Sequence, residues 1–471
     1  MPPRRFRLLR RCPCARLPQL ALLAPLLLAM ASLAGCESKP PLGTGTRTVG
    51  ERRPPAPRAQ EARRRALPSV GLAREPELRI LLTRRVSGVE VQASRGFVAL
   101  DSAGRQLARY GSERRYSFFQ NRRRPERLEV VSEGLRGGAK TKAALGRLPF
   151  AESVTLQPLA GGVLTVNGKS YRGRLKLWRE EDHFSCLNLL PMELYLRGVV
   201  PHEIGDLPPS GFEAMKAQAV ASRTYAVQRL IASRERAWDM VDTVADQVYR
   251  GAEAESPAAN RAIDATRGQL LFAGEEPAEI YYASTCGGAT VAIDEVWKHA
   301  PVPHLRMVRD VDGEGRAWCR ASKLYRWRQA WSAKQLGQIL RAYLPPAAGL
   351  PADTEVGYLK AIAIAERTPE GRAKRLVVTT DRGEFVVLGD RIRSALKRDL
   401  EGNALRSIFF ELKTERDKQG RLVRITATGA GWGHGIGMCQ VGAIGRSTAG
   451  QRYDAILAAY YPGTRLARRW H

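Results

Sequence analysis

The chain has 471 residues, and its 76 Lys and Arg against 47 Asp and Glu give a formal charge of +29. With 44% hydrophobic and 26% charged residues it can bury a large core, which excludes wholesale disorder. Its seven cysteines are too few for a scaffold built on disulfides. The charge alone would suit nucleic-acid binding, but the chain has no base-reading motif, so we expect no nucleic-acid partner.

The first 35 residues have the features of a secretory signal. Arginines without any acidic residue precede an apolar run over residues 20–33, which is shorter than the roughly 20 residues that span a bilayer. The run ends in Leu-Ala-Gly-Cys36, which resembles the lipobox of bacterial lipoproteins, whose cysteine is acylated. We predict a lipoprotein signal peptide over 1–35, lipidation of Cys36, and an exported, membrane-anchored protein that faces the periplasm or cell wall. The alternatives are an ordinary signal peptide and an uncleaved anchor.

The mature chain divides by composition into a tether and a folded part. Residues 36–76 are rich in Pro, Arg and Gly and have almost no apolar periodicity, which predicts a disordered tether. From residue 77, short apolar runs separated by turn residues indicate strands. The folded part is expected over 77–466, with a strand-rich N-terminal part over 77–185 and a catalytic part over 186–466.

Strands and helices do not alternate regularly along the folded part. Hairpin turns are expected at Asn167-Gly168, at 381–383 and at 417–420. The helices are predicted at 211–233, 257–266, 332–343 and 453–460. This order predicts an α+β fold, in which a mixed strand-rich domain with a few helices surrounds a substrate cleft.

The longest predicted helix carries cations on its apolar side. Lys216 and Arg223 project into the apolar face, whereas Gln218 and Tyr225 point the other way. Cations in an apolar stripe either extend to solvent or pair with a buried anion. Glu203, a short loop before the helix, is the candidate anion, either in a structural ion pair or in a polar cluster that faces a cleft.

The start of this helix has a capping pattern. Ser210 and Glu213 have the spacing of a capping box, in which Glu213 reaches back to the Ser210 amide.

Five motifs occur in one order along the chain. They are YLRGVVPHE at 195–203, KAQAVASRTY at 216–225, QVYRG at 247–251, STCGGAT at 284–290 and GWGHGIGMCQ at 431–440. Together they resemble the SpoIID/LytB family, which includes sporulation lytic transglycosylases and amidase enhancers. The resemblance runs from about residue 77 to 466.

The resemblance implies cleavage of peptidoglycan glycan strands, with Glu203 as the catalytic acid and base. A protonated carboxyl donates to the glycosidic oxygen, and the carboxylate then takes the proton of the muramic acid 6-hydroxyl, which closes an anhydro ring. No water is positioned, so a second carboxylate is dispensable. The alternative is a glycan-binding module that does not catalyse but activates a cell-wall amidase.

The implied partners are peptidoglycan glycan strands, the membrane through the N-terminal lipid, and a cell-wall amidase. No cofactor is expected. The substrate-binding residues implied by the motifs are Lys216, Gln218, Arg223, Tyr225, Gln247, Tyr249, Ser284, Trp432, His434 and Gln440. The Gly-rich motif at 431–440 is either a tightly packed core strand or a part of the cleft in which Trp432 stacks on a sugar.

Cysteine spacing leaves two interpretations open. Cys286, His299, His304 and Cys319 have loosely zinc-like spacing. Some relatives in the family bind zinc near the STCGG segment through additional His and Cys, but the residues around that segment here are apolar or aromatic. We therefore expect a Cys286–Cys319 disulfide and no metal site.

Overall fold

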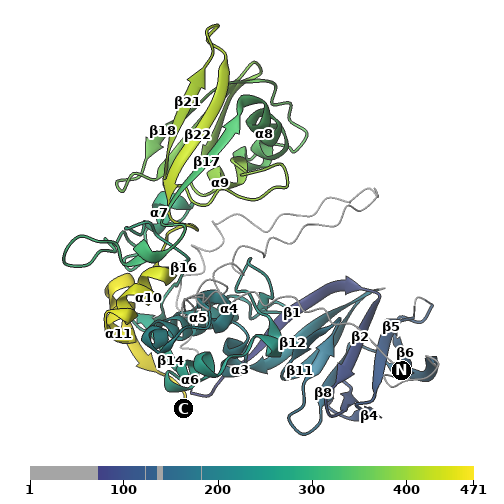
Figure 1. Ribbon diagram of the computed structural model, residues 1–471. Coiled ribbons are helices and arrows are strands. Elements are labelled where there is room, and N and C mark those ends of the chain that lie inside the picture. The colour runs from purple at the N-terminus through teal and green to yellow at the C-terminus, as the bar shows by residue number, and fades with distance from the viewer. Residues whose placement is uncertain (1–72, 122, 135–141, 182) are drawn as a thin grey trace, which may run out of the picture. The chain divides into compact units, whose positions relative to one another are not determined.

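The computed structural model describes residues 73–121, 123–134, 142–181 and 183–471. The predicted signal peptide, Cys36 and nearly all of the predicted tether lie outside these residues. The described chain combines antiparallel strands with a smaller number of helices (Figure 1). The α+β class is therefore confirmed.

Two sheets form the N-terminal part. The first has the strand order β13-β1-β12-β11-β8-β3-β4 and the second the order β10-β9-β2-β5-β6-β7. The strands of the first are β1 (Glu77–Val86), β3 (Phe97–Leu100), β4 (Gln106–Tyr110), β8 (Ser153–Pro158), β11 (Arg174–Glu180), β12 (His183–Pro191) and β13 (Met240–Val241). Those of the second are β2 (Gly88–Ala93), β5 (Arg114–Gln120), β6 (Arg127–Gly134), β7 (Lys142–Pro149), β9 (Leu164–Val166) and β10 (Lys169–Tyr171).

An aromatic cluster joins the two sheets. Phe97 and Tyr110 come from the first sheet, and Tyr116 and Phe118 from the second; their ring centroids lie 4.8–6.3 Å apart across four sheet-to-sheet pairs. All four rings are buried. Period-2 alternation of buried residues along β5 directs Tyr116 and Phe118 inward.

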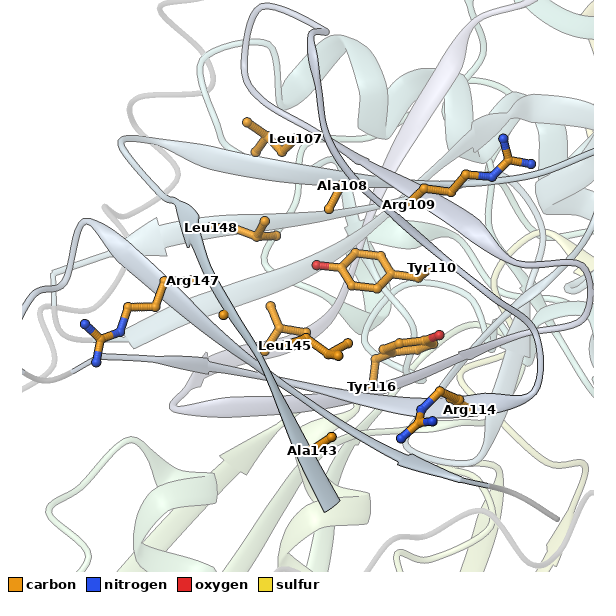
Figure 2. Close-up of a pocket in the computed structure, with 12 residues that line it drawn as sticks. Leu107, Ala108, Arg109, Tyr110, Arg114, Tyr116, Ala143, Leu145, Arg147 and Leu148 are labelled. Carbon is orange, nitrogen blue, oxygen red and sulfur yellow. The ribbon is translucent and has the colours of Figure 1, made fainter. Parts of the chain in front are cut away.

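A cavity of about 580 Å³ lies against part of this cluster. Figure 2 shows Tyr110 and Tyr116 side by side on one wall, while the guanidinium groups of Arg109 and Arg147 point away from these rings. None of the residues that the motifs predict for the substrate site lines this cavity.

The Asn167-Gly168 hairpin is confirmed, but its second strand ends early. Asn167 and Gly168 have φ values of +47° and +83°, which suit the turn between β9 and β10. At Gly173 the backbone has φ +77°, and a Cβ there would lie 2.3 Å from the carbonyl oxygen of Leu189. The chain leaves the second sheet at this point and enters the first as β11.

Helices follow β12 and form the core of the C-terminal part. They are α3 (Met192–Arg197), α4 (Val200–Ile204), α5 (Phe212–Ala232), α6 (Pro257–Ala265), α7 (Ile293–Val296), α10 (Gln440–Thr448) and α11 (Tyr453–Tyr460). Helix α5 contacts α4, α6, α10 and α11, and Figure 1 shows α10 and α11 beside it. Short strands accompany them: β14 (Gln269–Ala273), β15 (Glu276–Pro277), β16 (Tyr282–Ala283), β23 (Met438–Cys439) and β24 (Arg465–Arg468).

A second strand-rich region lies between the STCGG and GWGHG motifs. Its sheets are β17-β22-β21 and β18-β19-β20, accompanied by α8 (Ala333–Ala348) and α9 (Arg391–Ala395). The strands are β17 (Arg326–Ser332), β18 (Leu359–Arg367), β19 (Ala373–Thr380), β20 (Gly383–Leu388), β21 (Phe410–Arg416) and β22 (Leu422–Ala430). The two hairpins predicted here, β19–β20 and β21–β22, are confirmed.

Among the described residues, none of the helices has both the length and the apolar character needed to cross a membrane.

The sheet switch at Gly173 predicts a large effect of a small substitution. Gly173→Ala should lower the free energy of unfolding by roughly 3 kcal/mol, because the new methyl group meets a backbone oxygen and the residue has positive φ. Gly168→Ala is the matched control, since it also has positive φ but no atom lies within 4 Å of an added Cβ. It should cost about 1 kcal/mol. Urea-induced unfolding of both variants measures the difference; equal effects would contradict the close approach at Gly173.

Candidate functional site

Glu203 lies on a one-turn helix, α4, which was not predicted from the sequence. Helix α4 begins after Val199, has Pro201 in its first turn and ends at Gly205. The loop 247–251 holds this helix from one side, because the Arg250 amide donates to the Gly198 carbonyl over 3.1 Å. A Cβ at Gly198 would lie 2.5 Å from the Tyr249 ring, so glycine is required where the two motifs meet.

The carboxyl group of Glu203 has neutral hydrogen-bond donors only. The backbone amide of Val248 donates to Oε1 over 3.1 Å, and the side chain of Gln440 also donates to the carboxylate. Among the described residues, Glu203 forms no ion pair. Burial raises the pKa of Glu203 to about 7, and the two hydrogen bonds oppose this effect without cancelling it.

A buried chain of amides and hydroxyls continues from Gln440. Its Nε2 donates to Gln218 Oε1 over 3.3 Å, and Gln218 Nε2 donates to Ser222 Oγ over 3.0 Å. Gln218 and Ser222 are one helical turn apart on α5 and fully buried. Helix α5 is thus buried around most of its circumference from Ala214 to Val227, and the predicted division into an apolar and a polar face is wrong.

A second arm of this network reaches the QVYRG motif. Gln247 Nε2 donates to the Tyr282 hydroxyl over 2.7 Å, and the Tyr195 hydroxyl donates to Gln247 Oε1 over 3.1 Å. The Ser222 and Tyr282 hydroxyls lie 3.4 Å apart and join the two arms. These hydrogen bonds link side chains of separate segments, which holds the walls around Glu203 in one arrangement.

Lys216 lies with Glu213 and not with Glu203. Its Nζ is 2.7 Å from Glu213 Oε1 and lies over the rings of Phe212 and Tyr453. The predicted capping box is therefore wrong: Gly211 is the N-cap residue without a side-chain cap, and Glu213 Oε2 instead accepts the Tyr453 amide over 2.9 Å.

Arg223 forms a fully buried ion pair. Its Nη2 lies 2.6 Å from Glu193 Oε2, and the side chains of both residues are 0–3% exposed. The Trp470 indole and the Gly268 amide also donate to Glu193. The anion that pairs with Arg223 is therefore Glu193 and not Glu203. For Arg223, the interpretation as a structural ion pair holds, but with a different partner from the one expected.

The Gly-rich motif packs against the STCGG segment. Trp432 exchanges two backbone hydrogen bonds with Thr285, and β23 pairs in parallel with β16. The Ile436 amide donates to His434 Nδ1 over 3.1 Å, so the proton is on Nε2, which donates to the Tyr282 carbonyl over 3.0 Å. Burial lowers the pKa of His434 to about 4, which keeps the ring neutral.

The structure separates the predicted substrate-binding residues by exposure. Those with part of the side chain accessible are Lys216, Tyr225, Ser284, Trp432 and His434, as is Glu203. Those that are buried are Gln218, Arg223, Gln247, Tyr249 and Gln440. The buried group supports the site from behind. Tyr225 donates to Asp246 over 3.1 Å and Tyr249 to Asn188 over 2.7 Å.

The cysteines do not form the expected disulfide. The Sγ atoms of Cys286 and Cys319 lie 3.7 Å apart, well beyond the roughly 2.05 Å of an S–S bond, and both are free thiols. The predicted alternative set is not assembled either, because His299 and His304 bind the Ala300 and Glu279 carbonyls. Instead, Cys439 and Asp310 join Cys286 and Cys319 in one buried cluster.

Several residues of the site were missed from the sequence. Tyr282 and Ser222 lie inside or beside the recognised motifs, and the i, i+4 spacing of Gln218 and Ser222 on a helix was a usable signal. The Val248 amide has no side-chain signature, because any residue supplies a backbone N–H. Asp310 lies between β16 and β17 with no local pattern that marks it.

Comparisons with known proteins show the family to which the chain belongs. The model of the SpoIID family, described as stage II sporulation protein, matches residues 180–272, and a domain of unknown function, DUF8618, matches residues 317–437. An uncharacterized protein of Brachyspira hyodysenteriae is 30% identical over 67% of this chain and 76% of its own length. The chain belongs to the SpoIID/LytB family.

Two relatives from Bacillus subtilis have functional names. The amidase enhancer is 28% identical over 58% of this chain and 40% of its own length. Stage II sporulation protein D is 27% identical over 59% of this chain and 75% of its own length. This chain thus spans less than half of the amidase enhancer.

The ion pair of Arg223 predicts a stability effect that Lys216 does not share. Arg223→Met should lower the free energy of unfolding by about 3–5 kcal/mol, because Glu193 would remain buried without its counter-charge. Lys216→Met is the matched control on the same helix; its pair with Glu213 is partly exposed, and the loss should be about 1 kcal/mol or less. Chemical unfolding of both variants tests this. A cost for Arg223→Met as small as that of Lys216→Met would contradict the structural role.

Proposed function

We propose that this protein is an exported lytic transglycosylase that cleaves peptidoglycan glycan strands with Glu203 as general acid and base. The observation that carries the proposal is the environment of Glu203: its pKa is raised to about 7 by burial, and only neutral donors contact it. A carboxyl group in this state is protonated and ionised in comparable amounts near neutral pH. It therefore suits a reaction in which it gives and then takes one proton.

The proposed reaction is balanced within the substrate. Protonated Glu203 donates to the glycosidic oxygen while the C1–O bond breaks, and the leaving sugar departs as an alcohol. The carboxylate then removes the proton of the 6-hydroxyl of the same muramic acid, whose oxygen forms the new bond to C1. Glu203 returns to its protonated form, no water is consumed, and an anhydro-muramic end results.

The partly exposed residues of the motifs are proposed to bind the glycan. Trp432 offers a ring face on which a sugar stacks; neutral His434 lies on the same segment, and Ser284 directly precedes Thr285, which pairs with Trp432. The buried amides Gln218, Gln247 and Gln440 are proposed to position the carboxyl group rather than touch the sugar. Among the described residues no cation forms an ion pair with Glu203, which is consistent with a carboxyl group that must hold a proton.

Export and anchoring complete the proposal. Arginines before an apolar run, and the Leu-Ala-Gly-Cys36 ending, support a lipoprotein that faces the periplasm or cell wall. Stable anchoring takes more than one acyl chain, which lipidation of such a cysteine supplies. We accordingly propose that residues 1–35 are a signal peptide, residues 36–76 a tether and residues 77–466 the folded part.

The alternative function is a glycan-binding activator of a cell-wall amidase. The observation that favours it is the 28% identity with a relative named amidase enhancer. An activator needs the exposed surface near Trp432 but not a proton on Glu203. Replacement of the Glu203 carboxyl group therefore distinguishes the two functions.

Replacement of Glu203 should abolish cleavage but not binding. Glu203→Gln keeps the shape and cannot ionise, so the release of anhydro-muramic products from peptide-stripped peptidoglycan should fall about a hundredfold or more. Asp206→Asn is the matched control, because this exposed carboxylate three residues away only accepts from Ser256. Mass spectrometry of the released products measures both.

Two results would overturn the enzyme proposal. One is wild-type protein that binds the glycan but releases no anhydro products. The other is Glu203→Gln protein that releases as many products as the wild type. Stimulation of a purified amidase by both proteins to the same extent would then favour the activator.

The pH dependence of cleavage should follow the pKa of Glu203. Because the protonated form donates in the first step, kcat/KM should fall as the pH rises above about 7. Gln440→Leu removes a hydrogen bond that favours the charged form, so the pKa of Glu203 should rise and the alkaline limb should move to higher pH. The profiles of wild type, Gln440→Leu and Asp206→Asn are compared. An alkaline limb that stays in place or moves down in Gln440→Leu would refute the assignment.

A further inference from the structure

Three thiols and one carboxylate, from four separate segments, converge beside the Gly-rich motif. Cys286 follows β16, Asp310 and Cys319 lie in the loop before β17, and Cys439 ends β23. One ligand atom of each lies within 4.8 Å of the ligand atoms of the other three, and all four residues are buried. None of them takes part in the proton transfers proposed for Glu203.

We propose that Cys286, Asp310, Cys319 and Cys439 bind one zinc ion as a closed structural site. The distances suit a tetrahedral ion. With Zn–S bonds of about 2.3 Å, two thiolates of a tetrahedron are about 3.8 Å apart, and a thiolate and a carboxylate oxygen about 3.5 Å. The Cys286 and Cys319 sulfurs are 3.7 Å apart, and the Cys286 sulfur is 3.3 Å from Asp310 Oδ2.

Backbone N–H groups point at the sulfurs of Cys286 and Cys439. The Cys286 amide donates to Cys439 Sγ over 3.2 Å, and the Gly442 amide donates to the same atom over 3.3 Å. The Gly288 amide donates to Cys286 Sγ over 3.4 Å. Backbone N–H groups directed at sulfur stabilise negative charge there, which is the form that binds a metal.

The carboxylate is oriented as metal ligands usually are. Asp310 Oδ2 faces the thiols, whereas Oδ1 accepts the Tyr460 hydroxyl over 2.8 Å and lies 3.2 Å from Arg446 Nη2. A ligating carboxylate whose other oxygen is hydrogen-bonded in this way is held in place for the ion. Both carboxylate oxygens of Asp310 therefore have partners.

The charges nearby match a metal complex of this composition. Three thiolates, one carboxylate and Zn²⁺ sum to −2. Arg446 supplies one positive charge through Asp310, and Arg372, which is fully buried, supplies a second beside the cluster. Arg372 Nη2 donates to the Cys286 carbonyl over 2.7 Å, and within the described part of the chain no carboxylate lies at ion-pair distance from it.

Ligand type and geometry select the ion. Sulfur-rich tetrahedral sites favour zinc over magnesium, calcium and manganese, which prefer oxygen. Burial of all four ligands leaves no open position for a reacting water, so the site holds segments together and does not catalyse. The ion would fix the ends of β16 and β23 to the loop that carries Asp310 and Cys319.

Metal analysis of the full chain tests the site without any measurement of activity. Elemental mass spectrometry of the purified protein should find one zinc ion per chain. Protein in which cobalt replaces zinc should show the intense thiolate-to-cobalt absorption band of a tetrahedral sulfur site. Cys319→Ser and the isosteric Asp310→Asn should each lose most of the zinc. Cys186→Ser is the matched control, because this buried cysteine in β12 lies outside the cluster and should leave the zinc content unchanged.

A reversible titration covers the case in which a ligand variant does not fold. Wild-type protein stripped with a chelator should take up one equivalent of zinc again, and its three cluster thiols should then become protected from alkylation. Tyr460→Phe, which removes one hydrogen bond from Asp310, should weaken zinc affinity by about tenfold. Wild-type protein with no zinc before and after titration, or with a Cys286–Cys319 disulfide in its place, would overturn the proposal.

Discussion

Helix α5 is buried along its middle turns, and every polar group that it carries must therefore find a partner inside the protein. Arg223 meets Glu193, while Gln218 and Ser222 meet Gln440 and Tyr282. These partners come from α3, the STCGG region and the GWGHG motif, which are far apart in sequence. The demand for satisfied buried groups thus brings motifs that are far apart in sequence together at one place in the fold.

Glu193 and Glu203 also need hydrogen-bond partners inside the protein, but the partners of the two carboxyl groups differ in charge. Glu193 receives a guanidinium, an indole and a backbone amide, which together stabilise its charge. Glu203 receives one backbone amide and one side-chain amide, and burial outweighs them in its pKa. Ten residues apart, the two groups differ in the charge of their donors rather than in their depth alone. The site keeps its cations at Glu193 and Glu213, away from the group proposed to hold a proton.

Local patterns predicted the hairpins and four helices, because turn residues and apolar periodicity act over a few residues. Helix α4 was missed since five residues with a proline give no periodic signal, and α10 since its glycines argue against a helix. The partner of Arg223 and the full set of groups around Cys286 could not be predicted. Each depends on which buried group at long sequence separation comes close, as Glu193 does to Arg223 and Asp310 does to Cys286.

Cys439 and Gln440 connect the two clusters through a single peptide unit. The Cys439 sulfur faces Cys286 and Asp310, whereas the next side chain, Gln440, donates to Glu203. Cys439 also caps α10, because its sulfur accepts the Gly442 amide at the start of that helix. The residue that caps α10 and belongs to the thiol cluster is therefore the direct chain neighbour of the residue whose side chain donates to Glu203. Through this one peptide unit, the start of α10 is part of both the cluster and the surroundings of the carboxyl group.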